Sequence, residues 1–306
     1  MIRPLIAAGL LGILLLSCSA LATPQPTPLS TSTPTLTPPP TPFGLYGVSL
    51  LNKTYCTMDG EPQKMDIYFP QTGGPWPVVF YIHGGSWMEG DKGEAAGLGS
   101  WLTPQGYVVV SVNYRLYPFA RFPAMIEDIK CAVRFLRANA VEYNIDPNRI
   151  GAMGASAGGH LAALLGASDQ SAGWDVVEYT EYSSRVQAVI DTAGPSDLTQ
   201  RLDRGGLETI VVMAFGRPNL EIASPIAHVS PDDPPFLIIH GEKDAIVGLL
   251  HGQAMYDSLV EVGVPTQLVI VQNGGHDLKA PDGSPTTPTM EEINQTMLDF
   301  LEKYLK

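Results

Sequence analysis

The chain has 306 residues and a formal net charge of −13 at pH 7, and it carries no cluster of lysine and arginine. This charge distribution disfavours nucleic acid as a partner, because phosphate binding needs concentrated positive charge. The length suggests one or two domains, and no Cys/His spacing resembles a structural zinc site, so we expect neither metal nor cofactor.

The N-terminal stretch has the pattern of an export signal rather than of a folded domain. Arg3 precedes an apolar run over residues 5–16, which is too short to span a bilayer as a mature helix. The run ends in Leu15-Leu16-Ser17-Cys18, which resembles the lipobox of bacterial lipoproteins. The resemblance implies that residues 1–18 are a signal peptide ending at Cys18, which accepts the lipid. The alternative is an ordinary secretory signal cut near residues 19–22.

The next segment, residues 19–42, consists largely of Pro, Thr and Ser. Such a composition cannot bury enough apolar surface to offset chain entropy, so we expect an extended, solvated stalk. Residues 43–306 then form one globular domain. The arrangement predicts an exported protein, lipid-anchored on a bacterial membrane, with this domain outside the cytoplasm.

Beyond residue 50, apolar strand-like runs alternate with longer helical patterns. Residues 51–58 and 64–69 predict an antiparallel pair joined at Asp59-Gly60. The later alternation predicts an α/β fold with a mostly parallel sheet, helices on both faces and reactive groups at the carboxyl ends of the strands. The predicted strands are 78–83, 107–114, 150–154, 188–192, 236–240 and 267–271, and the predicted helices are 124–140, 157–167, 252–262 and 290–304.

Two of the three cysteines, Cys56 and Cys131, lie inside these elements. They could pair in an oxidising compartment. Because each sits in an apolar context, one in a strand and one on a helix face, the pattern favours two buried free thiols.

The motif His83-Gly84-Gly85-Ser86-Trp87 ends the strand at 78–83. Motifs of this type supply backbone N–H groups to an oxyanion hole, so we expect Gly84 and Gly85 to act there with Ala157. An ordinary glycine turn is the alternative. Trp87 is a candidate wall of the substrate pocket, although an aromatic side chain here could also close the core.

A nucleophile is predicted at Ser156. Gly154-Ala155-Ser156-Ala157-Gly158 fits G-x-S-x-G, with an apolar strand before it and a helix directly after it. The chemistry needs this context, because a very tight turn projects the hydroxyl and glycines remove side chains that would clash. The helix N-terminus also favours the developing negative charge.

A serine nucleophile needs a general base, and His276 is the best candidate among six histidines. It follows the last strand, in the Gly-rich loop Asn273-Gly274-Gly275-His276-Asp277. When a G-x-S-x-G serine lies on a sheet of this kind, the acid and then the histidine follow it along the chain. The other histidines precede the serine, lie in the helix after it, or come before or too close behind the acid: His83, His160, His228, His240 and His251.

Asp244 is the predicted acid, in a turn directly after the strand at 236–240. Glu242 and Asp277 are the rivals. We expect Glu242 to sit inside the turn, and Asp277 adjoins the histidine too closely to reach its far nitrogen easily.

These motifs together resemble the bifunctional feruloyl and acetyl-xylan esterase-like group of α/β-hydrolases, over nearly all of residues 51–304. The resemblance implies hydrolysis of carboxylic esters, often acetyl or feruloyl groups on plant polysaccharides, without a cofactor. It also suggests a buried Arg115–Asp128 ion pair and an N-cap at Asp91. The stretches that carry it, apart from the glycine motifs above, are 54–60, 65–68, 81–85, 90–92, 113–116 and 146–150.

The pocket is poorly specified. The space before residue 77 predicts only two strands, so no large N-terminal cap is expected, and residues 194–235 could form a small lid around a helix at 207–215. An open cleft suits a polysaccharide ester better than a buried long-chain lipid. The competing interpretations are a prolyl-oligopeptidase-like peptidase, a long-chain lipase, and a lipid-anchored binding protein without catalysis. No obligate protein partner is evident.

Overall fold

The computed structural model describes residues 47–200 and 207–306. The predicted signal peptide with its lipobox Cys18, and the predicted stalk at 19–42, lie outside the described residues. In the part that is described, no helix is both long and apolar enough to cross a bilayer.

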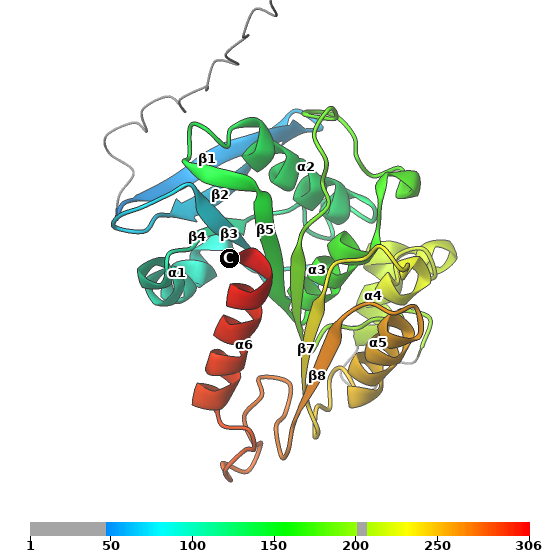
Figure 1. Ribbon diagram of the computed structural model, residues 1–306. Coiled ribbons are helices and arrows are strands. Elements are labelled where there is room, and N and C mark those ends of the chain that lie inside the picture. The colour runs from blue at the N-terminus through cyan, green and yellow to red at the C-terminus, as the bar shows by residue number, and fades with distance from the viewer. Residues whose placement is uncertain (1–46, 201–206) are drawn as a thin grey trace, which may run out of the picture. The chain divides into compact units, whose positions relative to one another are not determined.

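The described strands form one eight-stranded sheet in the order β1-β2-β4-β3-β5-β6-β7-β8 (Figure 1). β1, β2 and β4 pair antiparallel, and every pairing from β4–β3 onward is parallel. The strands are β1 (Ser49–Met58), β2 (Glu61–Tyr68), β3 (Trp76–Ile82), β4 (Val108–Val112), β5 (Ile145–Ala155), β6 (Ala188–Thr192), β7 (Phe236–Gly241) and β8 (Thr266–Val271).

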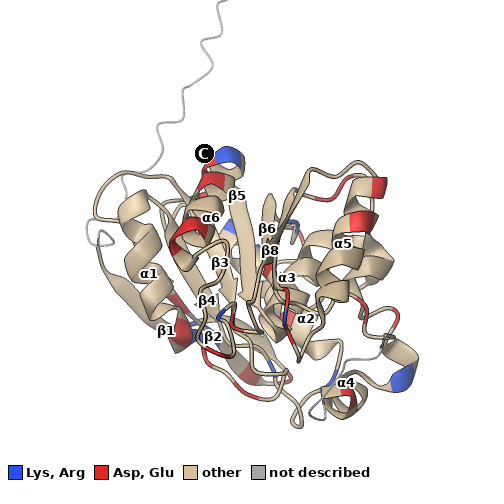
Figure 2. Cartoon of the chain, turned by 90° about the horizontal axis from the view of Figure 1, so that it is seen from below, with Lys and Arg blue, Asp and Glu red and all other residues tan. Residues whose placement is uncertain are grey.

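Helices cover both faces of the sheet, as Figure 2 shows, with α1 and α6 on one side and α2, α3 and α5 on the other. Alternate residues of a strand point to opposite faces, so Val109 packs in the layer with α6 while Val108 and Val110 pack in the layer with α2 and α3. The predicted fold class is confirmed. The helices are α1 (Ala96–Leu102), α2 (Ala124–Ala138), α3 (Ala157–Ala167), α4 (Leu207–Phe215), α5 (Leu249–Glu261) and α6 (Met290–Leu305).

Helix α1 was not predicted. Its sequence, AGLGSWL, contains two glycines, which lower helix propensity, and it is too short for a clear period. The signal for the start of this helical segment lies in the preceding 3-10 turn, Lys92–Ala95. Asp91 caps it by accepting a hydrogen bond from Gly93 N–H (2.7 Å), and Glu94 bonds back to Asp91 N–H, so the expected cap at Asp91 is confirmed.

The loop after β4 is held by the expected ion pair. The Arg115 guanidinium donates to Asp128 at 2.9 Å, and the Arg115 backbone N–H donates to the same carboxylate at 2.7 Å. The Asp128 side chain is fully buried at the start of α2. Burial raises its pKa to about 6, although the hydrogen bonds from Arg115 act in the opposite direction.

The prediction of two free thiols was wrong, because Cys56 and Cys131 form a disulfide. Cys56 lies on β1 and Cys131 on α2, and the packing of that helix against the strand brings their Cα atoms to 6.4 Å. An apolar context is shared by buried thiols and buried disulfides, so the local pattern could not separate them. Disulfides persist in oxidising compartments.

Because the disulfide closes a loop with a sequence separation of 75 residues, we expect it to stabilise the fold by about 2–4 kcal/mol. Replacing both Cys56 and Cys131 with serine should lower the free energy of unfolding, measured by urea denaturation of the full chain, by that amount. The matched control is the unmodified chain unfolded in a reductant. If reductant leaves its stability unchanged, the two thiols are not paired in the protein.

Candidate active site

Ser156 lies in a tight turn between β5 and α3. Its backbone adopts φ 56° and ψ −121°, which a non-glycine residue rarely adopts, and its N–H donates to the Thr192 carbonyl at 2.8 Å. The turn presses the first residues of α3 against the end of β3. A Cβ on Gly158 would lie 2.1 Å from the Ile82 carbonyl oxygen, so only glycine fits there. The strain and the close packing together place the serine hydroxyl above the sheet.

His276 reaches this hydroxyl from the loop after β8. Its Nε2 lies 2.8 Å from Ser156 Oγ, and its Nδ1 lies 2.7 Å from Asp244 Oδ2. The structure therefore brings the three predicted residues, 120 and 32 positions apart in sequence, into one hydrogen-bonded chain. With Nδ1 donating to the carboxylate, Nε2 is free to accept the serine proton.

The Asp244 side chain is buried and well supplied with donors. Its Oδ1 accepts hydrogen bonds from the N–H groups of Ile246 and Val247, both at 2.9 Å. Burial raises the pKa of this carboxyl. However, the hydrogen bond and charge of His276, with the two backbone donors, outweigh burial and hold the pKa below its ordinary value. Asp244 is therefore ionised at neutral pH.

The two rival acids lie elsewhere. Glu242 accepts a hydrogen bond from Asn273 N–H at 3.0 Å, and Asp277 accepts one from Lys279 N–H at 3.1 Å. The first hydrogen bond joins the loop after β7 to the loop after β8, and the second closes a turn next to His276. Neither carboxylate pairs with His276 among the described residues, so Asp244 is the acid that contacts this histidine.

The glycine motif after β3 lies beside the serine. A Cβ on Gly84 would lie 3.6 Å from Ser156 Cβ, and the Gly85 carbonyl accepts the N–H groups of Met88 and Glu89 to close a turn. Within the described ranges, no protein acceptor takes the N–H of Gly84, Gly85 or Ala157. Ala157 opens α3, whose dipole adds to the positive potential. The three donors can thus serve an anionic oxygen near Ser156.

Lys92, which is buried, anchors the C-terminal end of the loop that follows β3 and carries Gly84 and Gly85. Its role was not predicted from the sequence. Lys92 Nζ lies 3.5 Å from Asp66 and 3.7 Å from Asp91, and its backbone N–H donates to Asn113 Oδ1 at 2.7 Å. These contacts join the loop to β2 and to the end of β4. The signal was present in Gly90-Asp91-Lys92, but only the cap at Asp91 was assigned.

Trp87 differs from its predicted place at the pocket wall. Its side chain is 1% exposed, and its ring packs edge-on against His160 at 5.3 Å and Phe215 at 5.0 Å. It therefore closes the core beneath the loop, which is the alternative stated for it. His160 is also fully buried, and its Nε2 pairs with the Ala223 carbonyl at 2.8 Å.

A second residue missed in the sequence is Asp191, at the carboxyl end of β6. It is 1% exposed, and its Oδ1 accepts the Gly194 N–H at 3.0 Å and lies against Gly159 in the first turn of α3. The next residue, Thr192, holds the Ser156 N–H. Burial raises the pKa of Asp191 to about 7, against the opposing effect of the Gly194 bond. The sequence feature that could have identified Asp191 is an aspartate at the end of an otherwise apolar strand.

For residues 47–200 and 207–306, no group of three or more His, Cys, Asp or Glu side chains is arranged to hold a metal ion. The chemistry that the site offers is that of an activated serine hydroxyl beside a base and a set of backbone donors.

Comparison with known proteins finds a matching family and similar esterases. The BD-FAE family model matches residues 65–259. Two relatives from Mycobacterium tuberculosis are a probable carboxylic ester hydrolase, LipM, which is 35% identical over 62% of this chain and 46% of its own length, and the esterase LipC, which is 33% identical over 72% and 57%. The chain thus spans about half the length of these relatives. A truncated carbohydrate esterase from gut microbiota superposes with a TM-score of 0.71 at 28% identity, covering 86% of this chain and 98% of that one.

Because the pKa of Asp191 is raised, the free energy of unfolding should depend on pH in a way that can be measured. A buried carboxyl with a raised pKa stays protonated in the folded state while the unfolded chain has lost the proton. The stability it contributes is therefore full below its ordinary value of 3.8 and is lost as the pH rises through about 7. Asp191→Asn cannot titrate, so its free energy of unfolding relative to the unmodified chain should rise by about 4 kcal/mol between pH 4 and pH 8. Urea unfolding of both proteins at each pH measures the difference, and a constant difference would contradict the assignment.

Proposed function

The chain belongs to the BD-FAE family, and from this premise we propose that it is a serine hydrolase that cleaves short-chain or carbohydrate-linked carboxylic esters. The observation that carries the proposal is the hydrogen-bonded chain Ser156–His276–Asp244 beside three backbone N–H groups that have no acceptor among the described residues. Nucleophile, base, orienting acid and oxyanion donors are the parts that acyl transfer through an acyl-enzyme needs.

In this proposal each part has a role. His276 Nε2 takes the proton as Ser156 Oγ attacks the ester carbonyl, and the oxygen that becomes negative accepts hydrogen bonds from Gly84, Gly85 and Ala157. His276 then gives the proton to the departing alcohol, leaving the acyl group on Ser156. Water, activated by the same histidine, releases the acid. Asp244 stays ionised throughout, because its pKa is held low, and it stabilises the imidazolium.

A carbohydrate alcohol with an acetyl or feruloyl group is the proposed substrate class. The similarity to a carbohydrate esterase at 28% identity supports it. So does the topology, because between Gly47 and β3 the described chain holds only β1 and β2, with no helical cap over the sheet edge. A bulky polymer with a small acyl group needs such access. A long acyl chain would need an enclosed apolar cavity.

The proposal is tested with p-nitrophenyl esters from acetate to palmitate on the full chain. We expect turnover of acetate and butyrate, a loss of kcat on the order of 10⁴-fold or more in Ser156→Ala, and a loss of about 10⁴-fold in Asp244→Asn. Asp282→Asn, an exposed carboxylate in the loop that carries His276, is the matched control and should leave kcat unchanged.

The other outcomes separate the remaining interpretations. Preference for palmitate would favour a lipase, and turnover of a peptide anilide in place of the esters would favour a peptidase. A folded chain that hydrolyses none of these, and whose Ser156 does not react with a fluorophosphonate, would be a binding protein without catalysis.

We further propose that the domain works outside the cytoplasm, anchored through a lipid on Cys18. The lipobox-like sequence at residues 15–18 and the Cys56–Cys131 disulfide both favour an exported protein. Cys18→Ala should shift the protein from the membrane pellet to the soluble fraction after lysis of a producing bacterium, with the disulfide intact. Retention of the variant in membranes would contradict the anchor.

A further inference from the structure

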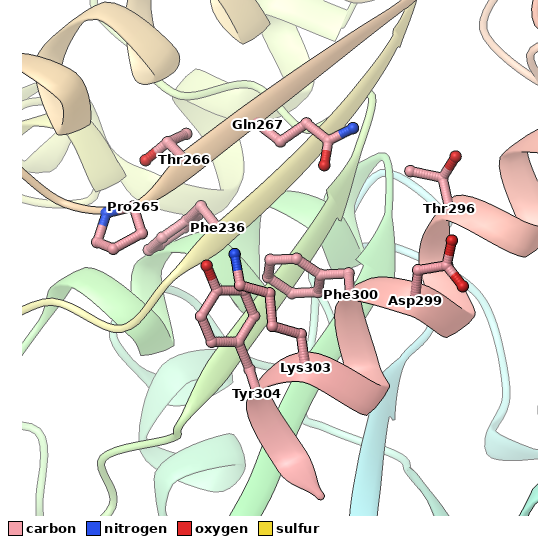
Figure 3. Close-up of a pocket in the computed structure, with 9 residues that line it drawn as sticks. All are labelled: Phe236, Pro265, Thr266, Gln267, Thr296, Asp299, Phe300, Lys303 and Tyr304. Atoms are coloured by element: carbon pink, nitrogen blue, oxygen red, sulfur yellow. The ribbon is translucent and has the colours of Figure 1, made fainter.

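A pocket of about 530 Å³ lies between the last turns of α6 and the first residues of β7 and β8 (Figure 3). The triad lies at the opposite edge of the sheet, because Asp244 and His276 follow the carboxyl ends of these same strands. β7 and β8 have six residues each, so at about 3.3 Å per residue the two edges are roughly 20 Å apart. The pocket is therefore separate from the active site.

Aromatic rings form one side of the pocket. Phe236 and Phe300 are buried, whereas Tyr304 is partly exposed, and its ring lies 4.9 Å from that of Phe300. Lys303 Nζ lies 4.8 Å from the Tyr304 ring centroid, and Figure 3 shows the two side chains next to each other. Phe300 and Lys303 therefore hold the ring of Tyr304 in place, and part of its side chain remains exposed at the pocket.

Polar groups surround these rings. The Gln267 amide and the Lys303 ammonium make no hydrogen bond to the described part of the chain, and Asp299 uses one oxygen, which accepts from Gln295 at 2.7 Å. Thr266 and Thr296 add hydroxyl oxygens that can still accept, because their hydrogens are donated to the carbonyls of Val264 at 3.0 Å and Glu292 at 2.9 Å. The pocket therefore holds unused donors and acceptors together, with one carboxylate and one ammonium.

We propose that this pocket is a second binding site for a neutral saccharide, and that it holds the polymer whose ester groups the active site cleaves. A sugar ring has an apolar face that can stack on Tyr304, and its hydroxyl groups both donate and accept hydrogen bonds, as Gln267, Asp299 and Lys303 require. An apolar ligand would leave these groups unpaired, and a phosphate would face Asp299.

The charge of the surrounding surface points in the same direction. The chain carries 31 acidic and 18 basic residues, and Figure 2 shows acidic residues along α6 with basic ones at its C-terminal end. The overall excess of acidic residues disfavours an anionic polymer, whereas it does not act against a neutral one. The inference rests on the proposed function for the identity of the polymer, but not for the presence of the site.

The test measures binding of the full chain to soluble deacetylated xylan by affinity gel electrophoresis. Deacetylation removes the ester, so binding is recorded without turnover. We expect the unmodified chain to be retarded, and Tyr304→Ala and Gln267→Ala each to lose at least tenfold in affinity. Neither variant should change kcat on p-nitrophenyl acetate. Tyr182→Ala, which removes a partly exposed tyrosine from the loop before β6, is the matched control and should bind as the unmodified chain does.

Three results would overturn the proposal. They are the absence of retardation of the unmodified chain, retardation of both pocket variants equal to that of the unmodified chain, or a dimer in sedimentation that Tyr304→Ala dissociates. In the last case a second copy would cover the pocket against the edge strand β8. Gln267→Ala, on the exposed strand, guards against a folding defect in Tyr304→Ala. Failure of the proposed function would be recorded separately, as no turnover of p-nitrophenyl acetate with xylan binding intact.

Discussion

The turn at Ser156 is the constraint on which the site depends. Its strained backbone is held from two sides, by the Thr192 carbonyl at the end of β6 and by the contact of Gly158 with the end of β3. Because β3 carries the Gly84-Gly85 loop, the same contact that forces Ser156 upward also places the N–H groups of that loop beside it. A fold that relaxed this turn would lose the projection of the Ser156 hydroxyl and the nearby N–H groups together.

The electrostatics follow from burial. Asp244 is buried but ionised, since His276 and two backbone N–H groups offset desolvation, whereas Asp191 has a single backbone donor and its pKa rises. In mildly acidic solution these two carboxyl groups, which lie at neighbouring strand ends, therefore differ in protonation: Asp244 is ionised and Asp191 is neutral. One orients the base, and the other packs as a neutral group beneath the first turn of α3.

Different parts of the sheet carry the stabilising contacts, the triad and the second pocket. The disulfide and the Arg115–Asp128 pair fasten β1, α2 and the loop after β4 to one another. The carboxyl edge carries Ser156, Asp244 and His276. The amino edge of β7 and β8 carries the aromatic and polar pocket, so a long polymer could contact the domain at two places.

Chain order and local motifs were enough to predict Ser156 and His276, because a strand–turn–helix around G-x-S-x-G and a histidine after the last strand are local patterns. They also predicted the sheet, since apolar periodicity records which face of each strand is buried. Asp244 was also predicted from its place after the strand at 236–240, and the structure adds that Glu242 and Asp277 bond elsewhere. Only the tertiary structure decided the pairing of Cys56 with Cys131 and the burial of Trp87. Each of these depends on how distant segments approach one another, and composition alone carries no record of that approach. Asp191 and Lys92 belong to the same group, because a charged residue reveals its role only when its partners are placed around it.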